Sequence, residues 1–404
     1  MSLGSFGLLG SAGLRLAALS LVLGAVASCR RVSTIPAQAL GPSSSAMPVA
    51  TVPTVASDLI AISDARGEVG FIDRQGHMVV APQFEQVLRA SEGLSATRQH
   101  GLWGFLDGRG KWAIPALFAQ AQPFSEGQAA AALPGAGEPV FGFIDHSGHW
   151  SIPPRFRTAT AFHGGFASVT LNGVAAYVNT TGTVAFTAPG EAGYDFRDGL
   201  ARFVSRGRMG FLNAEGQVAI PARFDDALDF SDGLAAVKVE KLWGFIDSSG
   251  TYRIRPRFID ASFFACGIAK IALNASQSGF VDSHGKLLGQ FEATSDCSNG
   301  YAAIMKGNRW GFMAPSGAVI VEPKFEKFEG GFAEELAAVA EPGRPFGYIG
   351  GDGRYVIEPR FTGAQAFENG FARIEQASHD AGITEVGYID RQGRLVWGPF
   401  PVTR

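Results

Sequence analysis

The fold is decided by a short stretch that recurs along the chain, and its clearest copy reads Trp243-Gly244-Phe245-Ile246-Asp247-Ser248-Ser249-Gly250. The apolar run before Asp247 predicts a short β-strand. Asp247 and Gly250 predict a tight turn, because Asp caps turns and Gly tolerates positive φ. A second strand starts at Tyr252 and continues into Pro256-Arg257-Phe258, since proline is tolerated near the end of an edge strand. The stretch therefore encodes a β-hairpin.

The same pattern occurs ten times, at intervals of 32 to 40 residues. Its first slot is glycine in nine copies and Ala176 in the fourth; the glycines are Gly70, Gly104, Gly142, Gly210, Gly244, Gly279, Gly311, Gly347 and Gly387. The next slot is aromatic in all ten copies, and a turn glycine always follows six residues after the first slot. Such self-similarity is the signature of a repeat architecture.

Each unit is predicted to hold three antiparallel strands, the third opening after a further glycine, as in Leu234 to Val239. A lone meander is marginal in water, so stacked units must bury the repeated Phe residues together. The fold class is therefore all-β, with about ten three-stranded units. We favour an open array, because no strand is left over to close a ring and propellers usually have four to eight blades of four strands. A closed β-propeller-like ring is the alternative.

Composition agrees with this architecture. Of 404 residues, 53 are Gly and 32 are Phe, while 46% are hydrophobic and 18% are charged. The hydrophobic share argues against disorder, and the glycine content argues against a helical bundle. The net charge of −3 provides no overall electrostatic attraction to nucleic acid, so no nucleic-acid partner is expected.

The repeated stretch resembles the WG repeats of bacteria, most closely at Trp103-Gly104-Phe105, Trp243-Gly244-Phe245 and Trp310-Gly311-Phe312. The resemblance covers residues 59–404. The fourth unit departs from it with Ala175-Ala176, and the seventh with Ser278-Gly279 and a missing proline. The resemblance implies a β-repeat fold and a binding role, with no catalytic residues and no cofactor.

The N-terminal segment is predicted to be a targeting sequence and not a part of the folded domain. Residues 1–28 have a short basic region and an apolar core too short to span a bilayer, which is typical of a signal peptide. The sequence Val26-Ala27-Ser28-Cys29 resembles a lipoprotein lipobox, which implies lipidation of Cys29 and, with Arg30 following, an exported protein anchored in the bacterial outer membrane. An ordinary signal peptide with an incidental Cys29 is the alternative.

Between this signal peptide and the repeats lies a predicted tether, residues 29–57. Residues 32–57 carry no charge and contain four prolines, so the tether is extended and semi-rigid. The WG-repeat β domain is then assigned to residues 58–404.

A basic residue stands just before the core Phe in five units: Arg155, Arg223, Arg257, Lys324 and Arg360. Strand alternation directs the Phe inward and the basic residue outward, so stacked units align these residues on one face. This basic column is a candidate face for an anionic ligand. The alternative is local pairing with acids such as Glu126, Asp198 and Asp232.

Cys266 and Cys297 lie in neighbouring units, and an exported location permits a disulfide between them. Such a bridge would add about 3 kcal/mol to stability by the chain-entropy estimate. The two residues have different offsets within their units, which favours the alternative that they are buried small hydrophobes.

No metal site is expected. The turn aspartates offer one acid each and are interpreted as turn caps, and His146 and His149 lack a third ligand. Ten similar units without a distinctive polar cluster favour a non-enzymatic scaffold that binds an envelope protein or glycan. A carbohydrate- or cell-wall-binding protein, a purely structural envelope component and a hydrolase are the alternatives.

Overall fold

Every sheet of the protein is a short antiparallel ladder of consecutive strands. The computed structural model describes residues 59–64, 66–135, 137–378 and 384–402, which form nine four-stranded sheets and one three-stranded sheet. They belong to one compact unit spanning Met47–Arg404, and they include no helix with the length and apolar character of a membrane span. The predicted signal peptide, Cys29 and the tether to residue 57 lie outside the described residues.

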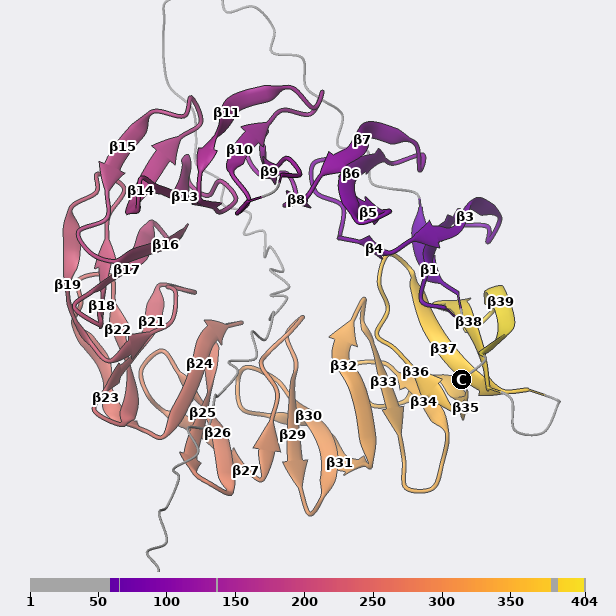
Figure 1. Cartoon of the computed structure of the whole chain (residues 1–404). Helices are drawn as coiled ribbons and strands as arrows, with labels where there is room; N and C mark the ends of the chain where they lie inside the picture. Colours follow the sequence, from indigo (N-terminus) through magenta and orange to yellow (C-terminus); the bar gives the residue numbers. More distant parts are fainter. Residues whose placement is uncertain (1–58, 65, 136, 379–383, 403–404) are drawn as a thin grey trace, which may run out of the picture. The chain divides into compact units, whose positions relative to one another are not determined.

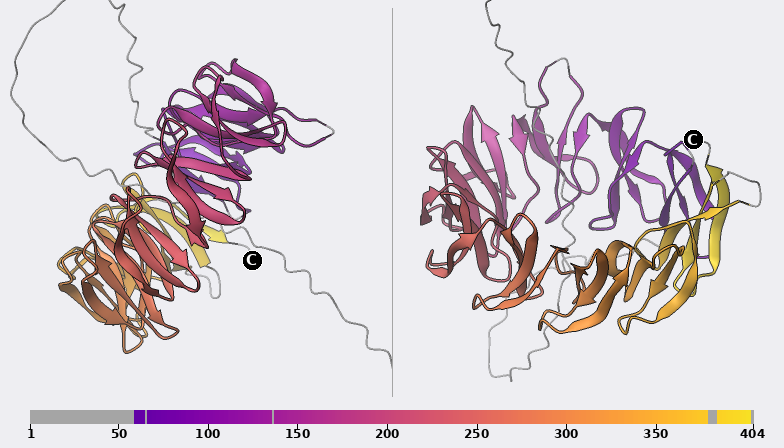
Figure 2. Two further views of the ribbon diagram at one scale, coloured as in Figure 1. Left: turned by 90° about the vertical axis from the view of Figure 1, so that its left-hand side faces the viewer. Right: turned by 90° about the horizontal axis from the view of Figure 1, so that it is seen from below.

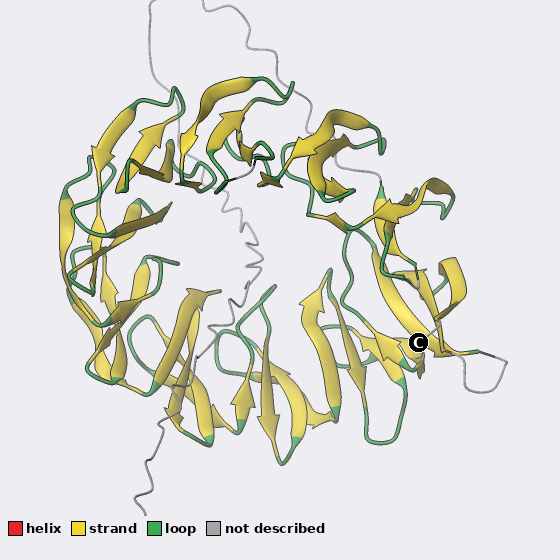
Figure 3. Cartoon of the chain, in the orientation of Figure 1, coloured by secondary structure: helices red, strands yellow, loops and turns green. Residues whose placement is uncertain are grey.

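The ten sheets follow one another around a closed ring, as the blades of a β-propeller do (Figure 1). We number them blades 1 to 10 in chain order. Within blades 2 to 10 the first strand lies nearest the ring centre and the fourth lies outside. Figure 2 shows the same ring from two perpendicular directions, and Figure 3 shows that strands and loops alone build it. The predicted all-β repeat fold is thus confirmed, in its alternative form, the closed ring.

The innermost strands of blades 2 to 10 are β4 (Gln86–Val87), β8 (Gln120–Ala121), β12 (Thr158–Ala159), β16 (Ala192–Arg197), β20 (Asp226–Ala227), β24 (Asp260–Ala265), β28 (Ala293–Thr294), β32 (Lys327–Ala333) and β36 (Gly363–Ala364). The second strands, beginning with blade 1, are β1 (Ile60–Ser63), β5 (Leu94–Gln99), β9 (Ala129–Ala132), β13 (Phe166–Leu171), β17 (Leu200–Ser205), β21 (Leu234–Val239), β25 (Ile268–Asn274), β29 (Ala302–Lys306), β33 (Leu336–Ala340) and β37 (Phe371–Ala377).

The third strands carry the Trp-Gly slot and are β2 (Val69–Ile72), β6 (Leu102–Asp107), β10 (Phe141–Ile144), β14 (Val174–Asn179), β18 (Arg208–Leu212), β22 (Leu242–Asp247), β26 (Gln277–Asp282), β30 (Arg309–Met313), β34 (Phe346–Ile349) and β38 (Thr384–Asp390). The outer strands are β3 (Met78–Phe84), β7 (Trp112–Phe118), β11 (Trp150–Phe156), β15 (Val184–Thr187), β19 (Val218–Phe224), β23 (Tyr252–Phe258), β27 (Leu287–Phe291), β31 (Val319–Phe325), β35 (Tyr355–Phe361) and β39 (Leu395–Val402).

The prediction of three strands per unit is wrong for blades 2 to 10, which have four. The extra strand is the innermost one, which is not among the three strands that the sequence predicts. Six of the nine innermost strands are only two residues long, too short to show a period in the sequence. The chain enters each blade through this strand and leaves it at the core Phe of the outer strand.

The glycine of each Trp-Gly slot is required by the neighbouring strand. A Cβ atom on Gly104 would lie 2.6 Å from the Ile114 carbonyl oxygen, and one on Gly244 would lie 2.5 Å from the Ile254 carbonyl oxygen. The outer strand bulges at this point, because Trp103 pairs with Phe118 while Phe105 pairs with Ile114. The repeat therefore needs a glycine opposite this bulge, and bulges increase the twist of a strand.

The turn aspartates act as caps, as the sequence predicts. The Asp107 Oδ1 atom accepts hydrogen bonds from the backbone N–H groups of Arg109 and Lys111, both at 2.9 Å. Asp73 and Asp390 accept the equivalent pairs of bonds in their own turns. This geometry fixes the turn between the third and outer strands.

The hydrophobic core lies between the blades. The rings of Phe105 and Phe124 are 4.9 Å apart, and those of Phe245 and Phe264 are 4.9 Å apart. In both pairs the first ring belongs to a third strand. The second ring belongs to the next blade, where Phe124 follows the innermost strand β8 and Phe264 lies near the end of β24. A blade therefore buries its apolar faces against its two neighbours, which agrees with the predicted stacking.

The ring closes through side-chain packing between blades 1 and 10, without exchange of a strand. Ile60 and Ile62 of blade 1 form one buried cluster with Phe371 and Tyr388 of blade 10. Among the described residues blade 1 has three strands and lacks an innermost one, and on that side the Arg89 Nε atom of blade 2 lies 3.8 Å from the Glu368 Oε1 atom of blade 10. Apolar packing therefore closes the ring, and the expectation that closure needs a spare strand is wrong.

Closure can be tested at Gly76, whose added Cβ would lie 2.0 Å from the Val396 carbonyl oxygen of blade 10. Gly93 is the control position, because its φ of +83° is close to the +85° of Gly76 and the space around it is open. We expect Gly93→Ala to lower the free energy of unfolding by about 1–2 kcal/mol through its positive φ alone. Gly76→Ala should cost about 1–3 kcal/mol more, because of the clash across the closure. Equal losses in urea unfolding would contradict a closed ring.

Candidate binding site

The predicted basic column lies on the outer strands, and its arginines hold neighbouring blades together. The Arg223 Nη2 atom donates a hydrogen bond to the Gly250 carbonyl oxygen at 2.8 Å, and Arg257 donates to Gly285 at 2.8 Å. Arg155 and Arg360 make the same bond to Gly182 and Gly393. In each case the acceptor is the turn glycine of the next blade.

The fifth member, Lys324, has its Nζ atom 3.5 Å from a carboxylate oxygen of Glu341 in blade 9. All five cations also lie 5.0 Å from the ring centre of the Phe that follows them. The residues thus occupy equivalent places, but a structural partner in the next blade engages each of them. Binding of an anionic ligand to this face stays a prediction.

The acids that the sequence offered as partners of the column have a different role. Glu126 accepts a hydrogen bond from the Gly165 backbone N–H at 2.8 Å, and Asp232 accepts one from Gly267 at 2.9 Å. Asp198 does the same for Gly233 at 3.0 Å. Each bond joins the turn before a second strand to the same turn of the next blade. Acids and arginines therefore form two separate ladders around the ring.

A third ladder uses serine. The Oγ atoms of Ser91, Ser125 and Ser231 donate to the carbonyl oxygens of core phenylalanines in the next blade, at distances of 2.7, 2.6 and 2.7 Å. These repeated contacts make most junctions between blades alike. A junction that departs from them is the natural place to look for a function of its own.

The junction of blades 7 and 8 departs from them, because Ser278 occupies the slot that holds tryptophan in blades 2, 6 and 8. Blade 4 has Ala175 in this slot, but there Ala175 is buried in one cluster with Tyr177 and Phe196. In the preceding junction Trp243 is buried and packs in one cluster with Ala261 of the next innermost strand. In the following junction the Trp310 ring lies 4.6 Å from that of Phe328. Ser278 is too small to make such a contact, so the corresponding space in blade 7 is open.

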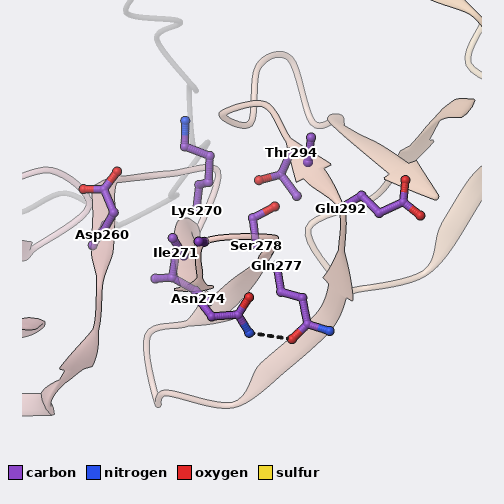
Figure 4. A pocket seen from close by; sticks show the side chains of 12 residues that line it. Asp260, Lys270, Ile271, Asn274, Gln277, Ser278, Glu292 and Thr294 are labelled. Atoms are coloured by element: carbon purple, nitrogen blue, oxygen red, sulfur yellow. Dashed lines mark hydrogen bonds between the residues drawn. The ribbon is translucent and has the colours of Figure 1, made fainter. Parts of the chain in front are cut away.

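The open space is a pocket of about 270 Å³ between β24, β25 and β26 of blade 7 and β28 of blade 8 (Figure 4). Its polar lining comes from both blades: Asp260, Lys270, Asn274, Gln277, Ser278, Glu292 and Thr294. The outer strand of blade 7 is also short, with five residues in β27 against seven in β23. The loss of the Trp and of the proline-containing segment occurs together in this blade.

Several polar groups of the pocket are held in place by their neighbours. The Asn274 amide donates to the Gln277 side-chain oxygen at 2.8 Å, and the Lys270 Nζ atom lies 3.6 Å from Asp296. Backbone N–H groups of Asn308 and Gly307 donate to Glu292 and lower the pKa of its carboxyl group. The pocket is therefore a fixed array of donors and acceptors.

The Thr294 hydroxyl is the group that most needs a partner. Its oxygen is buried and has no hydrogen-bond partner among the described residues. Figure 4 shows this side chain at the wall of the pocket, facing Ser278 across the junction. A buried hydroxyl without a partner costs free energy, and this one lies next to the pocket.

This polar cluster cannot be seen in the sequence of any one unit. Asp260, Lys270 and Glu292 are separated along the chain and come together only at the junction. The sequence signal that points to it is Ser278-Gly279, the departure of the seventh unit from the repeat.

The chemistry of the pocket is suited to binding. Its lining includes no His and no Cys, and Figure 4 shows Lys270 extending away from Ser278. A serine nucleophile needs a base within hydrogen-bond reach. Among the described residues no group of three or more His, Cys, Asp or Glu side chains could hold a metal ion.

A second hollow of about 690 Å³ lies among turns of blades 8, 9 and 10, next to Tyr301 and Gly351. The ion pair between Arg391 and Glu335 spans it at 3.0 Å. The Glu335 side chain is 89% exposed, so the hollow is open to solvent.

Comparison with known proteins gives a family and a fold. The sequence matches the family described as "WG containing repeat" in seven segments that together cover more than half of the chain: residues 70–103, 103–132, 141–174, 209–243, 243–275, 310–341 and 346–377. The segment containing Ser278 is not among them. No curated protein matches the sequence.

Solved structures are similar in fold at low sequence identity. A crystal structure of a eukaryotic initiation factor has a TM-score of 0.51 and 9% identity, covering 84% of this chain and 95% of that one. The computationally designed Ika8 protein has a TM-score of 0.35 and 12% identity, over 67% and 95% of the two chains. BamB from Moraxella catarrhalis has a TM-score of 0.32 and 11% identity, over 68% and 91%. The first likeness shows the fold alone.

The arginine ladder makes a prediction about stability. Arg223→Ala should lower the free energy of unfolding by about 1 kcal/mol, because it removes a charged hydrogen bond to the next blade. Arg109→Ala, at an exposed turn, is the control and should change stability by less than about 0.5 kcal/mol. If Arg223→Ala left stability unchanged but weakened binding to a polyanion such as heparin, the column would be a ligand face instead.

Proposed function

The chain belongs to the family of WG-containing repeat proteins, and on that premise we propose that it is a non-enzymatic binding scaffold of the bacterial envelope. The repeated junctions hold the ring together, and the junction of blades 7 and 8 binds the ligand. The observation that carries this proposal is the replacement of the motif tryptophan by Ser278, which opens a polar pocket at this junction.

The ligand class that fits the pocket is a neutral or amine-bearing carbohydrate. Amide and hydroxyl groups, as in Asn274, Gln277 and Thr294, both donate and accept hydrogen bonds, which matches the hydroxyl groups of a sugar. The lining carries two carboxylates against one ammonium, so it disfavours a polyanion. A volume of about 270 Å³ lies at the lower end of ligand pockets and suits one sugar unit.

Location is the second part of the proposal. The lipobox-like sequence at Cys29 supports an exported lipoprotein, and the uncharged tether that follows gives the ring reach from the membrane surface. A diacylated cysteine anchors stably, because two acyl chains are enough where one is not. In this arrangement the scaffold binds envelope glycan and takes no part in its chemistry.

The pocket is tested by filling it. Ser278→Trp restores the family residue and should abolish or weaken binding by at least about tenfold, a loss of 1.4 kcal/mol or more. Binding is measured with the full-length protein on an array of neutral and amino-sugar oligosaccharides, including peptidoglycan fragments. Gln277→Ala should weaken the same signal by removing one amide.

Val218→Trp is the matched control, since it adds the same side chain at an exposed site on β19 of blade 5. It should leave both binding and thermal stability unchanged. Undiminished binding by Ser278→Trp would exclude the pocket as the site. An absence of signal from the wild-type protein on every glycan would contradict the carbohydrate assignment.

The anchor is tested by Cys29→Ser. Without the cysteine thiol no lipid can be attached, so the protein should move from the membrane fraction to the soluble fraction after cell lysis and centrifugation. Metabolic labelling with a radioactive fatty acid should mark the wild-type protein and not the variant. Retention of the variant in membranes would contradict the lipoprotein assignment.

A further inference from the structure

The junction of blades 7 and 8 also carries the two cysteines of the described residues. Cys266 follows Ala265, the last residue of β24, and Cys297 follows β28. Phe264 stands three residues before Gly267, in a slot that is phenylalanine in most blades. Cys297 occupies this slot in blade 8, whereas Cys266 stands two residues after it in blade 7. The two cysteines therefore occupy different slots in neighbouring blades.

The junction of blades 8 and 9 shows that these two slots face each other. Asn299 occupies in blade 8 the slot that Cys266 occupies in blade 7, and its side-chain nitrogen donates to the carbonyl oxygen of Phe332 at 2.8 Å. Phe332 is the core aromatic residue of blade 9 and lies in a buried cluster with Phe312. In the sequence, the different positions of the two cysteines within their units favour two unconnected cysteines. In the ring, this same difference in position places the two slots opposite each other across a junction.

The junction also lacks contacts that join other blades. Ala265 stands where Ser231 and Ser125 donate hydrogen bonds to the next blade, and alanine has no side-chain donor. Cys297 is smaller than the phenylalanine found at this slot in most blades, so less apolar surface is buried there. A covalent bond between the blades would compensate for both losses.

The two thiols are neighbours and differ in exposure. Burial raises the pKa of the Cys297 thiol, and the nearby Cys266 thiol adds to the rise. Cys297 lies in an apolar cluster with Ile268 and Phe280, while Cys266 is exposed. An incoming oxidant therefore meets Cys266 first, with Cys297 behind it as the resolving thiol.

We propose that Cys266 and Cys297 are a modification site at which a disulfide joins blades 7 and 8. The oxidant is a disulfide donor, such as an oxidising dithiol protein or oxidised glutathione. The Cys266 thiolate attacks the donor disulfide and forms a mixed disulfide, releasing one donor thiol. The Cys297 thiolate then attacks the Cys266 sulfur and releases the second donor thiol. Two S–H bonds are lost, one S–S bond forms, and the two electrons and two protons end on the donor.

The bond would close the end of the junction opposite to the pocket. Asp260, the first residue of β24, and Glu292, which directly precedes β28, line the pocket, and the cysteines follow the ends of the same strands. Oxidation would therefore fix the spacing of blades 7 and 8 where the serine ladder is interrupted. This inference does not depend on the ligand of the pocket.

The test uses full-length Cys29→Ser protein, which retains Cys266 and Cys297 as its two thiols. After equilibration with oxidised glutathione, free thiols are alkylated and the protein is digested with trypsin without reduction. We expect peptides 258–270 and 287–306 to be recovered as one linked species, two hydrogen atoms lighter than their sum. Reduction should separate them and lower the melting temperature by a few degrees.

The control is Cys266→Ser in the same background. It should yield no linked peptide, and its melting temperature should not respond to a reductant. Recovery of both wild-type peptides as separate, fully alkylated species after oxidation would overturn the proposal. So would a linked peptide between two different molecules, which mixing of isotopically labelled and unlabelled protein would reveal.

Discussion

The close approach of each motif glycine to the outer strand is the contact on which the rest of the ring depends. Without a side chain at Gly104, the outer strand can bulge toward it and place two extra residues opposite Phe105. Blade 4 shows the converse, since Ala176 stands in the slot and pairs in register with Thr187, next to Tyr177 and Phe186. The glycine thus sets the local bend of the outer strand, and the bend sets where the chain enters the next blade.

Once the blades are shaped alike, three ladders of hydrogen bonds join them. Arginines reach the carbonyl groups of turn glycines, acids reach the N–H groups of other turn glycines, and serines reach the carbonyl groups of core phenylalanines. Each bond is worth little alone, but the same bond recurs around the ring. This repetition explains why the basic column, which suggests a ligand face in the sequence, has structural partners in the structure. Function is then expected at the junction where repetition fails.

The sequence was a good guide to what repeats and a poor guide to what lies between repeats. The positions of the turns, the buried aromatic residues and the Asp caps all follow from local rules, because each depends on a few adjacent residues. The two-residue strand Gln86–Val87 could not be predicted, since it exists only through pairing with β5. Closure could not be predicted either, because it rests on contacts between Ile62 and Tyr388, which are more than 300 residues apart.

The candidate site was hidden for the same physical reason. Ser278 was visible as a departure, but the residues that give the pocket its chemistry come from two blades and meet only in the folded ring. Cys266 and Cys297 stand at different positions within their units, which in the sequence argues against a bond between them. The way neighbouring blades pack reverses this conclusion. A repeat sequence shows which residues share a slot, whereas the angle between blades decides which slots face each other.

The central claim is that the chain forms a closed ring in which every blade has two neighbours. Hydrogen–deuterium exchange measured along the whole chain tests it most directly, because protection reports the free energy of local opening. The account predicts that amides of β2 and β38, in the first and last blades, exchange as slowly as those of β18 and β22 in the middle of the chain. Protection that falls steadily from the middle toward both ends would show an open array and contradict the ring.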